Sequence, residues 1–207
     1  CALPAPTPTT VEETARRSYY EAMEELVAGN YVHATQLFQK VSRSPAYVRH
    51  AALARLRMGD ALFLQQHFEE AIEAYRGFVS QYGSNPNLPY ARYRIAVCYF
   101  RRIPGHWIIV PPRHEKDQSM TRQAVRELAG FVRTFPTSPF AEDAEVKLVE
   151  ARRILLNHEL YVADYYAQQE RWLAVAWRLD AAIRDYPELT GESELFWRRA
   201  EAFQGAG

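Results

Sequence analysis

The chain has 207 residues, of which 48% are hydrophobic and 24% are charged, a composition typical of a folded globular protein rather than a disordered one. Its 25 basic and 25 acidic residues cancel to a net charge of zero. This balance argues against binding to nucleic acid, which relies on a cationic surface. No stretch approaches the roughly 20 consecutive apolar residues of a membrane-spanning helix, so we do not expect the polypeptide to cross a bilayer.

Residues 1–10 are predicted to form a flexible tether, because residues 2–10 contain three prolines and no charged side chain. A cysteine ahead of such a segment resembles a mature bacterial lipoprotein, in which the thiol carries a diacylglyceryl group and the amine an acyl chain. The likeness implies lipid anchoring through Cys1, and Ala2 implies sorting to the outer membrane, on its periplasmic face. The alternative is that the sequence begins at Cys1 only because it was cut at an arbitrary position.

Small residues recur with a period of 37 residues from the tether onward. They stand at Ala22, Gly59, Ala96, Ala163 and Ala200, with separations of 37, 37, 67 and 37. A second series, Tyr31, Phe68, Thr121 and Trp172, marks where partner helices are expected to begin. Each unit is predicted to be a helical hairpin whose small residues let two helices approach closely.

The pattern within residues 58–83 resembles the tetratricopeptide repeat, whose length is close to the observed period. We therefore expect an all-α solenoid of about four and a half helical hairpins. Residues 11–100 would form the amino-terminal repeats and residues 118–207 the carboxy-terminal repeats.

Residues 101–117 interrupt the third repeat and are predicted to be an inserted loop, because they contain three prolines and a glycine. Trp107, Ile108 and Ile109 lie in this loop. They either pack back against the repeats or anchor a partner.

A long helix is predicted within residues 140–169, which contain no proline or glycine. Ser138 is expected to cap this helix, with Pro139 at its first position.

No sequence motif indicates catalysis or a cofactor. There is no glycine-rich phosphate loop and no nucleophile elbow, and the six histidines are scattered. His106, His114 and Glu115 come closest to a metal site, but their spacing on one loop does not support one. The flanks of Cys98 are apolar and favour a packed, inert thiol. We expect neither an enzyme nor a metal protein.

Three blocks of residues resemble the BamD-type lipoproteins of the outer-membrane β-barrel assembly machinery. The first is Lys116, Asp117, Gln118 and Thr121. The second is Phe135, Pro136, Ser138, Phe140, Ala141, Asp143 and Ala144. The third comprises His158, Glu159, Val162, Ala163, Tyr165, Tyr166, Trp172, Ala174, Val175, Arg178, Tyr186 and Pro187. The chain departs from the family pattern at Gln169 and Glu170, where the family has a basic residue and glycine.

The resemblance implies a non-catalytic scaffold with two kinds of partner. The carboxy-terminal repeats would dock on a POTRA domain of a BamA-type barrel subunit, with Arg178 meeting a carboxylate and Tyr165, Trp172 and Asp117 nearby. The amino-terminal repeats would help to recognise the carboxy-terminal targeting strand of unfolded outer-membrane proteins. Other Bam lipoproteins are further partners that the resemblance implies.

Candidate contacts for that strand are Tyr19, Tyr20, Tyr31, Tyr47 and Phe68, and their alternative role is packing between helices. A competing function for the whole chain is an outer-membrane adaptor that organises peptidoglycan or cell-division enzymes.

Overall fold

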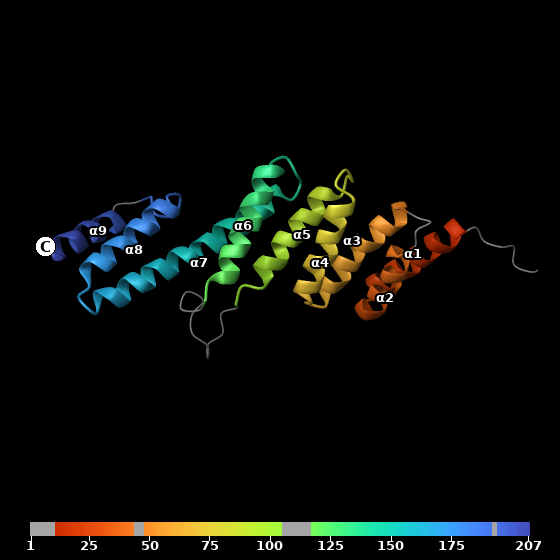
Figure 1. Ribbon diagram of the computed structural model, residues 1–207, viewed down its shortest axis with the longest axis horizontal. Coiled ribbons are helices and arrows are strands. Elements are labelled where there is room, and N and C mark those ends of the chain that lie inside the picture. The colour runs from red at the N-terminus through yellow and green to blue at the C-terminus, as the bar shows by residue number, and fades with distance from the viewer. Residues whose placement is uncertain (1–10, 44–47, 105–116, 192–193) are drawn as a thin grey trace, which may run out of the picture. The chain divides into compact units, whose positions relative to one another are not determined.

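The computed structural model describes residues 11–43, 48–104, 117–191 and 194–207, and the regular structure in these ranges is α-helical. The chain forms two compact units, Cys1–Arg101 and Arg102–Gly207. The first contains α1 (Val11–Val27), α2 (Tyr31–Ser42), α3 (Val48–Leu64), α4 (Phe68–Gln81) and α5 (Leu88–Arg101). The second contains α6 (Ser119–Thr134), α7 (Ala141–Ala167), α8 (Trp172–Asp185) and α9 (Glu194–Gly205), as labelled in Figure 1.

Within each unit, every helix packs against the next one along the chain. Short turns join most of them, so neighbouring helices run antiparallel as hairpins. This arrangement confirms the predicted all-α fold of tetratricopeptide type. The predicted starts of the partner helices are also confirmed, since Tyr31, Phe68 and Trp172 are the first residues of α2, α4 and α8, and Thr121 lies in the first turn of α6.

One type of turn recurs between α1 and α2, α3 and α4, and α7 and α8. Gly29, Gln66 and Glu170 have positive φ angles of 85°, 63° and 56°, the left-handed conformation that ends many helices. The next backbone N–H in each turn bonds to the carbonyl oxygen five residues earlier, at 2.9, 2.9 and 3.0 Å for Asn30, His67 and Arg171. Because Gly29 and Gln66 are one repeat apart, the turn is part of the repeat itself.

The core of the first unit is built by apolar residues of α3, α4 and α5. Leu56, Tyr75, Phe78 and Ile95 are buried there. Cys98 is fully buried in the same cluster, which confirms its predicted role as a packed thiol. A second cluster, which includes Ala22, Ala34 and Phe38, holds α1 and α2 on α3.

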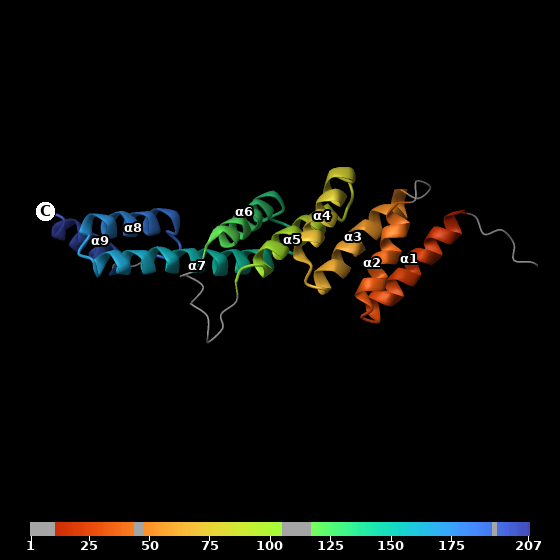
Figure 2. The ribbon, with the colours of Figure 1, turned by 60° about the horizontal axis from the view of Figure 1, so that its bottom comes forward.

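The second unit is organised by the 27-residue helix α7, which confirms the predicted long helix. At 1.5 Å per residue it is about 40 Å long, enough to pack against two partners in succession. Figures 1 and 2 show α6 across its first half and α8 along its second half. At the second contact, Ala163 is fully buried in a cluster with Val175, Leu179 and Ala202 of α8 and α9.

Two local predictions were wrong. Ser138 does not cap α7, which begins at Ala141 and has no side-chain cap. The Ser138 hydroxyl instead accepts a hydrogen bond from the backbone N–H of Phe140 at 3.3 Å. Pro139 and Phe140 still belong to the turn, so Ser138 lies too far ahead of the helix to cap it. In α9, Ala200 is exposed and Ala202 is the buried small residue, since the face of α9 that meets α8 is rotated from the register of the earlier repeats.

Candidate functional site

A cluster of polar side chains surrounds Asp60 of α3 inside the first unit. The hydroxyls of Tyr75 and Tyr90 donate hydrogen bonds to its Oδ1 atom at 2.6 and 2.7 Å. Arg57 donates from Nη1 to the other carboxylate oxygen, Oδ2, at 2.8 Å. The Nε atom of Arg94 lies 3.7 Å from Oδ1 and donates to the Tyr75 hydroxyl at 3.1 Å. We call these five residues the Asp60 cluster.

Burial and charge shift the pKa values of the Asp60 cluster in directions that favour this arrangement. Burial, followed by the nearby charge of Asp60, raises the pKa of Tyr75 and of Tyr90. Burial by itself would lower the pKa of Arg57, but the hydrogen bond and charge of Asp60 outweigh it and raise that pKa. Both tyrosines therefore stay neutral donors and the arginine stays charged at neutral pH.

Aromatic rings fix the two arginines of the Asp60 cluster. The guanidinium carbon of Arg94 lies 3.9 Å from the centre of the Phe63 ring. Arg57 and Arg94 both lie 5.8 Å from the centre of the Tyr90 ring. Such contacts hold a guanidinium flat against the ring and limit its motion.

The residues predicted to line a strand-binding groove do not share one groove. Tyr20 is exposed and lines a hollow formed by α1. Tyr31 lines another, beside Gln65 of the turn that follows α3. Tyr19 and Phe68 are half-buried and pack against Phe38 and Phe63, with ring centres 5.9 and 5.4 Å apart. Tyr47 lies outside the described residues.

A separate groove of about 470 Å³ runs between α2, α3 and α4 and contains none of these five residues. Met58, Leu62 and Ala74 give it an apolar lining, and Glu70 and Glu73 contribute carboxylates.

Arg178, the predicted partner-binding arginine on α8, is paired within its own unit. Its Nη1 atom donates to Oε2 of Glu159 on α7 at 3.0 Å, while 42% of the arginine side chain remains exposed. A partner carboxylate would therefore share Arg178 with Glu159. No sequence pattern indicates this pairing, because the two residues lie on different helices.

The other predicted partner contacts lie at different places in the second unit. Tyr165 is 53% exposed near the end of α7. Trp172 begins α8, and its ring rests against Gly205 of α9, where an added Cβ would stand 3.0 Å from the indole. Asp117 precedes α6, and hydrogen bonds from Ser119 lower the pKa of its carboxyl group. Tyr165, Trp172 and Arg178 are close along the chain, on the last turns of α7 and the first half of α8, whereas Asp117 is remote from them in sequence.

Exposed aromatic side chains are concentrated in the second unit, and several were not predicted as contacts. Trp177 of α8 is 63% exposed and Trp197 of α9 is 69% exposed. Among the described residues the first unit has one large exposed aromatic, Tyr20, whereas the second has seven: Tyr161, Tyr165, Trp172, Trp177, Phe196, Trp197 and Phe203. The sequence could not reveal this, because exposure depends on which helix faces are covered.

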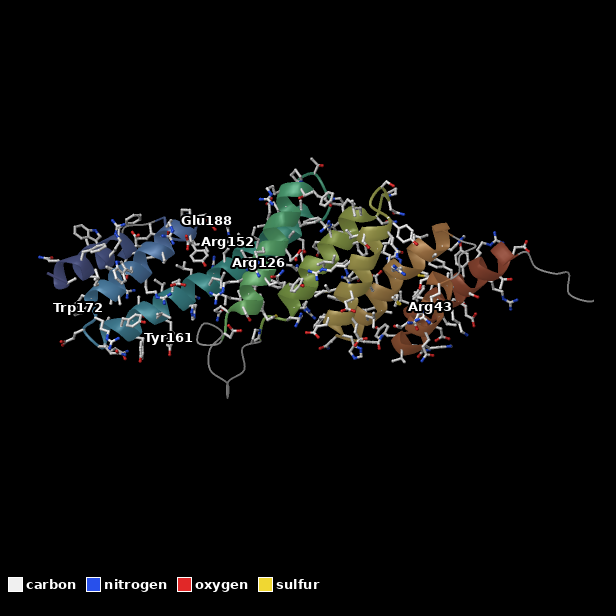
Figure 3. The ribbon with its side chains drawn as sticks, viewed as in Figure 1. Arg43, Arg126, Arg152, Tyr161, Trp172 and Glu188 are labelled. Atoms are coloured by element: carbon white, nitrogen blue, oxygen red, sulfur yellow. The ribbon has the colours of Figure 1, made fainter. Side chains whose placement is uncertain are left out.

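Ionic contacts tie α7 to its neighbours in the second unit. Figure 3 shows Arg152 of α7 directed toward Glu188, which follows α8, and their charged atoms are 2.6 Å apart. Arg198 of α9 forms an ion pair with Asp164 of α7. These contacts fix α8 and α9 on the long helix that carries Tyr165.

Several predicted residues lie outside the described ranges: Cys1, the loop residues Trp107, Ile108 and Ile109, and His106, His114 and Glu115. In the part of the chain that the structure describes, no three His, Cys, Asp or Glu side chains converge as metal ligands would. No helix in that part has the length and apolar character to span a bilayer.

Comparison with known protein families shows to which family the chain belongs. The YfiO family model, described as outer membrane lipoprotein, matches residues 11–207. The chain belongs to this family. The repeats and turns described above are therefore those of a YfiO-type protein.

Three relatives of the chain are each named outer membrane protein assembly factor BamD. The protein from Caulobacter vibrioides is 29% identical over 209 residues, which cover 100% of this chain and 66% of that protein. The protein from Neisseria meningitidis is 26% identical over 179 residues, covering 86% of this chain and 67% of that protein. The protein from Haemophilus influenzae is 26% identical over 194 residues, covering 91% of this chain and 73% of that protein. The chain thus spans about two thirds of the length of the first two relatives.

Glu170 stands at a position where the family has glycine. The sequence resemblance places a glycine there, and the structure gives Glu170 a φ angle of 56°. The turn of this YfiO-type chain therefore keeps the left-handed conformation without the glycine that favours it.

Proposed function

We propose that this chain is a non-catalytic scaffold for outer-membrane protein assembly that works with a BamA-type barrel subunit. The observation that supports this most strongly is the YfiO match over residues 11–207, together with relatives named outer membrane protein assembly factor BamD. Under this proposal Cys1 carries the lipid that holds the chain at the periplasmic face of the outer membrane. The amino-terminal repeats contact unfolded outer-membrane proteins.

The second unit is the surface that we assign to the barrel subunit, through one of its POTRA domains. Its exposed aromatics suit this role, because tryptophan, tyrosine and arginine dominate the binding energy of protein interfaces. Trp177 and Trp197 join the predicted contacts Tyr165, Trp172 and Arg178 on this unit. Asp117, at the start of α6, is the remaining predicted contact.

The test is co-purification of the full chain from membranes in mild detergent, with mass spectrometry of the proteins that stay bound. We expect a POTRA-bearing barrel protein, with less recovered for Arg178→Glu. Arg184→Glu is the matched control, because Arg184 lies on the same helix, is 69% exposed and pairs only with its neighbour Asp185 in the described structure.

A charge swap separates a partner contact from a folding defect. Arg178→Glu alone places a second carboxylate beside Glu159, whereas the double variant Arg178→Glu with Glu159→Arg restores the internal ion pair. If Arg178 meets a partner carboxylate, the double variant still fails to retain the barrel protein. Full recovery by the double variant would mean that Arg178 acts only within the chain.

The same experiment also tests the competing function. Peptidoglycan synthases or hydrolases bound in place of a barrel protein would overturn the assembly proposal and support an adaptor of cell-wall enzymes.

A further inference from the structure

The groove between α2, α3 and α4 carries opposite charges at its two ends. Arg55, Met58 and Leu62 line it along one face of α3. At one end the Nη1 atom of Arg55 lies 3.3 Å from the position of a Cβ on Gly77 of α4. Leu62 is two helical turns further along α3, or about 10 Å. Because α4 runs antiparallel to α3 after a short turn, Glu70 in the first turn of α4 lies at this second end.

The charged side chains of the groove have few partners within the chain. Arg55 is half-buried and Glu73 is exposed, and neither forms a hydrogen bond or an ion pair within the described ranges. Glu70 approaches the imidazole of His67, at 3.6 Å. A half-buried guanidinium without an acceptor has lost water without gaining a partner. The groove therefore offers unpaired charge at each end and apolar surface between the ends.

The walls of the groove favour a helix as its occupant. Helices α2 and α4 each pack against α3 but make no comparable contact with each other in the described part of the chain, so the groove lies over α3 between them. Ala74 and Gly77 leave one wall without long side chains, which lets another helix approach closely. Met58 and Leu62 are placed to receive the apolar stripe of an amphipathic helix.

Charge complementarity indicates the direction of that helix. Acidic residues are favoured in the first turn of a helix and basic residues in the last turn. An acidic first turn fits over Arg55, and a basic last turn fits beside Glu70 and Glu73. A helix placed in this way runs parallel to α3 and antiparallel to α2 and α4, so it forms antiparallel pairs with both walls.

We propose that this groove binds an amphipathic helix of a partner protein, with a carboxylate near its start and a basic side chain about two turns later. The proposal goes beyond the proposed function, which assigns the barrel subunit to the second unit and unfolded outer-membrane proteins to the amino-terminal repeats. A barrel strand is extended and alternates apolar with polar residues, so it is a different occupant from the helix proposed here.

The experiment measures fluorescence anisotropy of two labelled peptides with the full chain in detergent. Each peptide is a helix of about 14 residues, blocked at both termini, with leucines along one face. One peptide has a glutamate in its first turn and a lysine about two turns later, and the other has these two residues exchanged. We expect the first peptide to bind about tenfold more tightly than the second, with a smaller difference at high salt.

A charge exchange within the groove identifies the site. The double variant Arg55→Glu with Glu73→Lys keeps the net charge of the chain and should reverse the preference between the two peptides, which a damaged fold would not do. Its matched control is Arg92→Glu with Glu21→Lys, which also keeps the net charge. Both control residues are exposed and lie outside the groove, on α5 and α1, so the preference should stay as it is.

Equal binding of the two peptides would overturn the proposal, as would a preference that survives Arg55→Glu with Glu73→Lys. An extended peptide with the pattern of a barrel strand that displaces the first peptide as well as its own unlabelled form does would mean that a strand occupies the groove, and the proposal would be wrong. None of these outcomes changes the proposed function, because recovery of the barrel protein tests that function through the second unit.

Discussion

The ring of Tyr75 lies directly over Gly59, so that a Cβ atom added to Gly59 would stand 2.6 Å from a ring carbon. Tyr75 cannot swing away, because it is fully buried and its hydroxyl is bonded to Asp60. The small residue of the second repeat is therefore needed for the polar cluster as well as for close helix packing.

Substitution of Gly59 by alanine should lower the free energy of unfolding by about 3 kcal/mol, since overpacking a rigid core strains the backbone and the ring. Urea denaturation followed by circular dichroism measures the change. The control is Gly77→Ala, where the added Cβ meets only the flexible end of Arg55 at 3.3 Å and helix propensity favours alanine by about 1 kcal/mol. A Gly59→Ala chain as stable as Gly77→Ala would show that Tyr75 is free to move.

Glycine at position 170 should stabilise the chain. Glu170 has a φ of 56°, a conformation that costs a residue with a side chain roughly 1 kcal/mol relative to glycine. We expect Glu170→Gly to raise the free energy of unfolding by about 1 kcal/mol. Gln168→Gly is the control, since Gln168 has a φ of −61° and glycine there should destabilise. Thermal melts of both variants suffice, and a destabilised Glu170→Gly chain would contradict the prediction.

Stability should fall at alkaline pH because of Tyr75. Burial and the charge of Asp60 raise the pKa of Tyr75 above its ordinary value of about 10. The stabilisation is therefore complete below pH ~10 and is lost as pH rises further, when the unfolded chain releases the phenolic proton. The expected slope from this one residue is about 1.4 kcal/mol per pH unit.

Urea denaturation of the chain and of Tyr75→Phe at several pH values checks this slope. Tyr75→Phe should be less stable at pH 8, because Asp60 loses a donor, but its stability should fall less steeply above pH 10. Parallel pH profiles for the two proteins would mean that Tyr75 does not carry the effect.

Alanine at Gly205 should displace the ring of Trp172. The added Cβ would stand 3.0 to 3.2 Å from three indole atoms, and Trp172 is already 38% exposed, so the ring can move outward at little cost. We expect a shift of the Trp172 indole N–H signal in a 15N-labelled NMR spectrum, assigned with Trp172→Phe. Gly191→Ala is the control, because only a carbonyl oxygen at 3.9 Å lies near its Cβ position, and this variant should leave the signal in place.

Local sequence patterns predicted the repeats well. The recurrence of Tyr31, Phe68 and Trp172 along the repeats predicts the starts of α2, α4 and α8, and the structure shows that each follows a left-handed turn. The long helix α7 followed from the absence of proline and glycine. The predictions at Ser138 and Ala200 were wrong. At Ser138 the turn before the helix is two residues longer than expected, and at Ala200 the helix presents a different face to its neighbour. The spacing of residue types encodes neither difference.

The amino-acid sequence by itself determined the helical period, the long helix and the family resemblance, because each depends on residues that are near neighbours along the chain. Tertiary structure decided the Asp60 cluster, whose members come from α3, α4 and α5, and the sharing of Arg178 with Glu159 of another helix. It also decided that Trp177 and Trp197 stay exposed. These properties depend on which side chains meet when helices pack, and helix packing brings together residues that no local pattern connects.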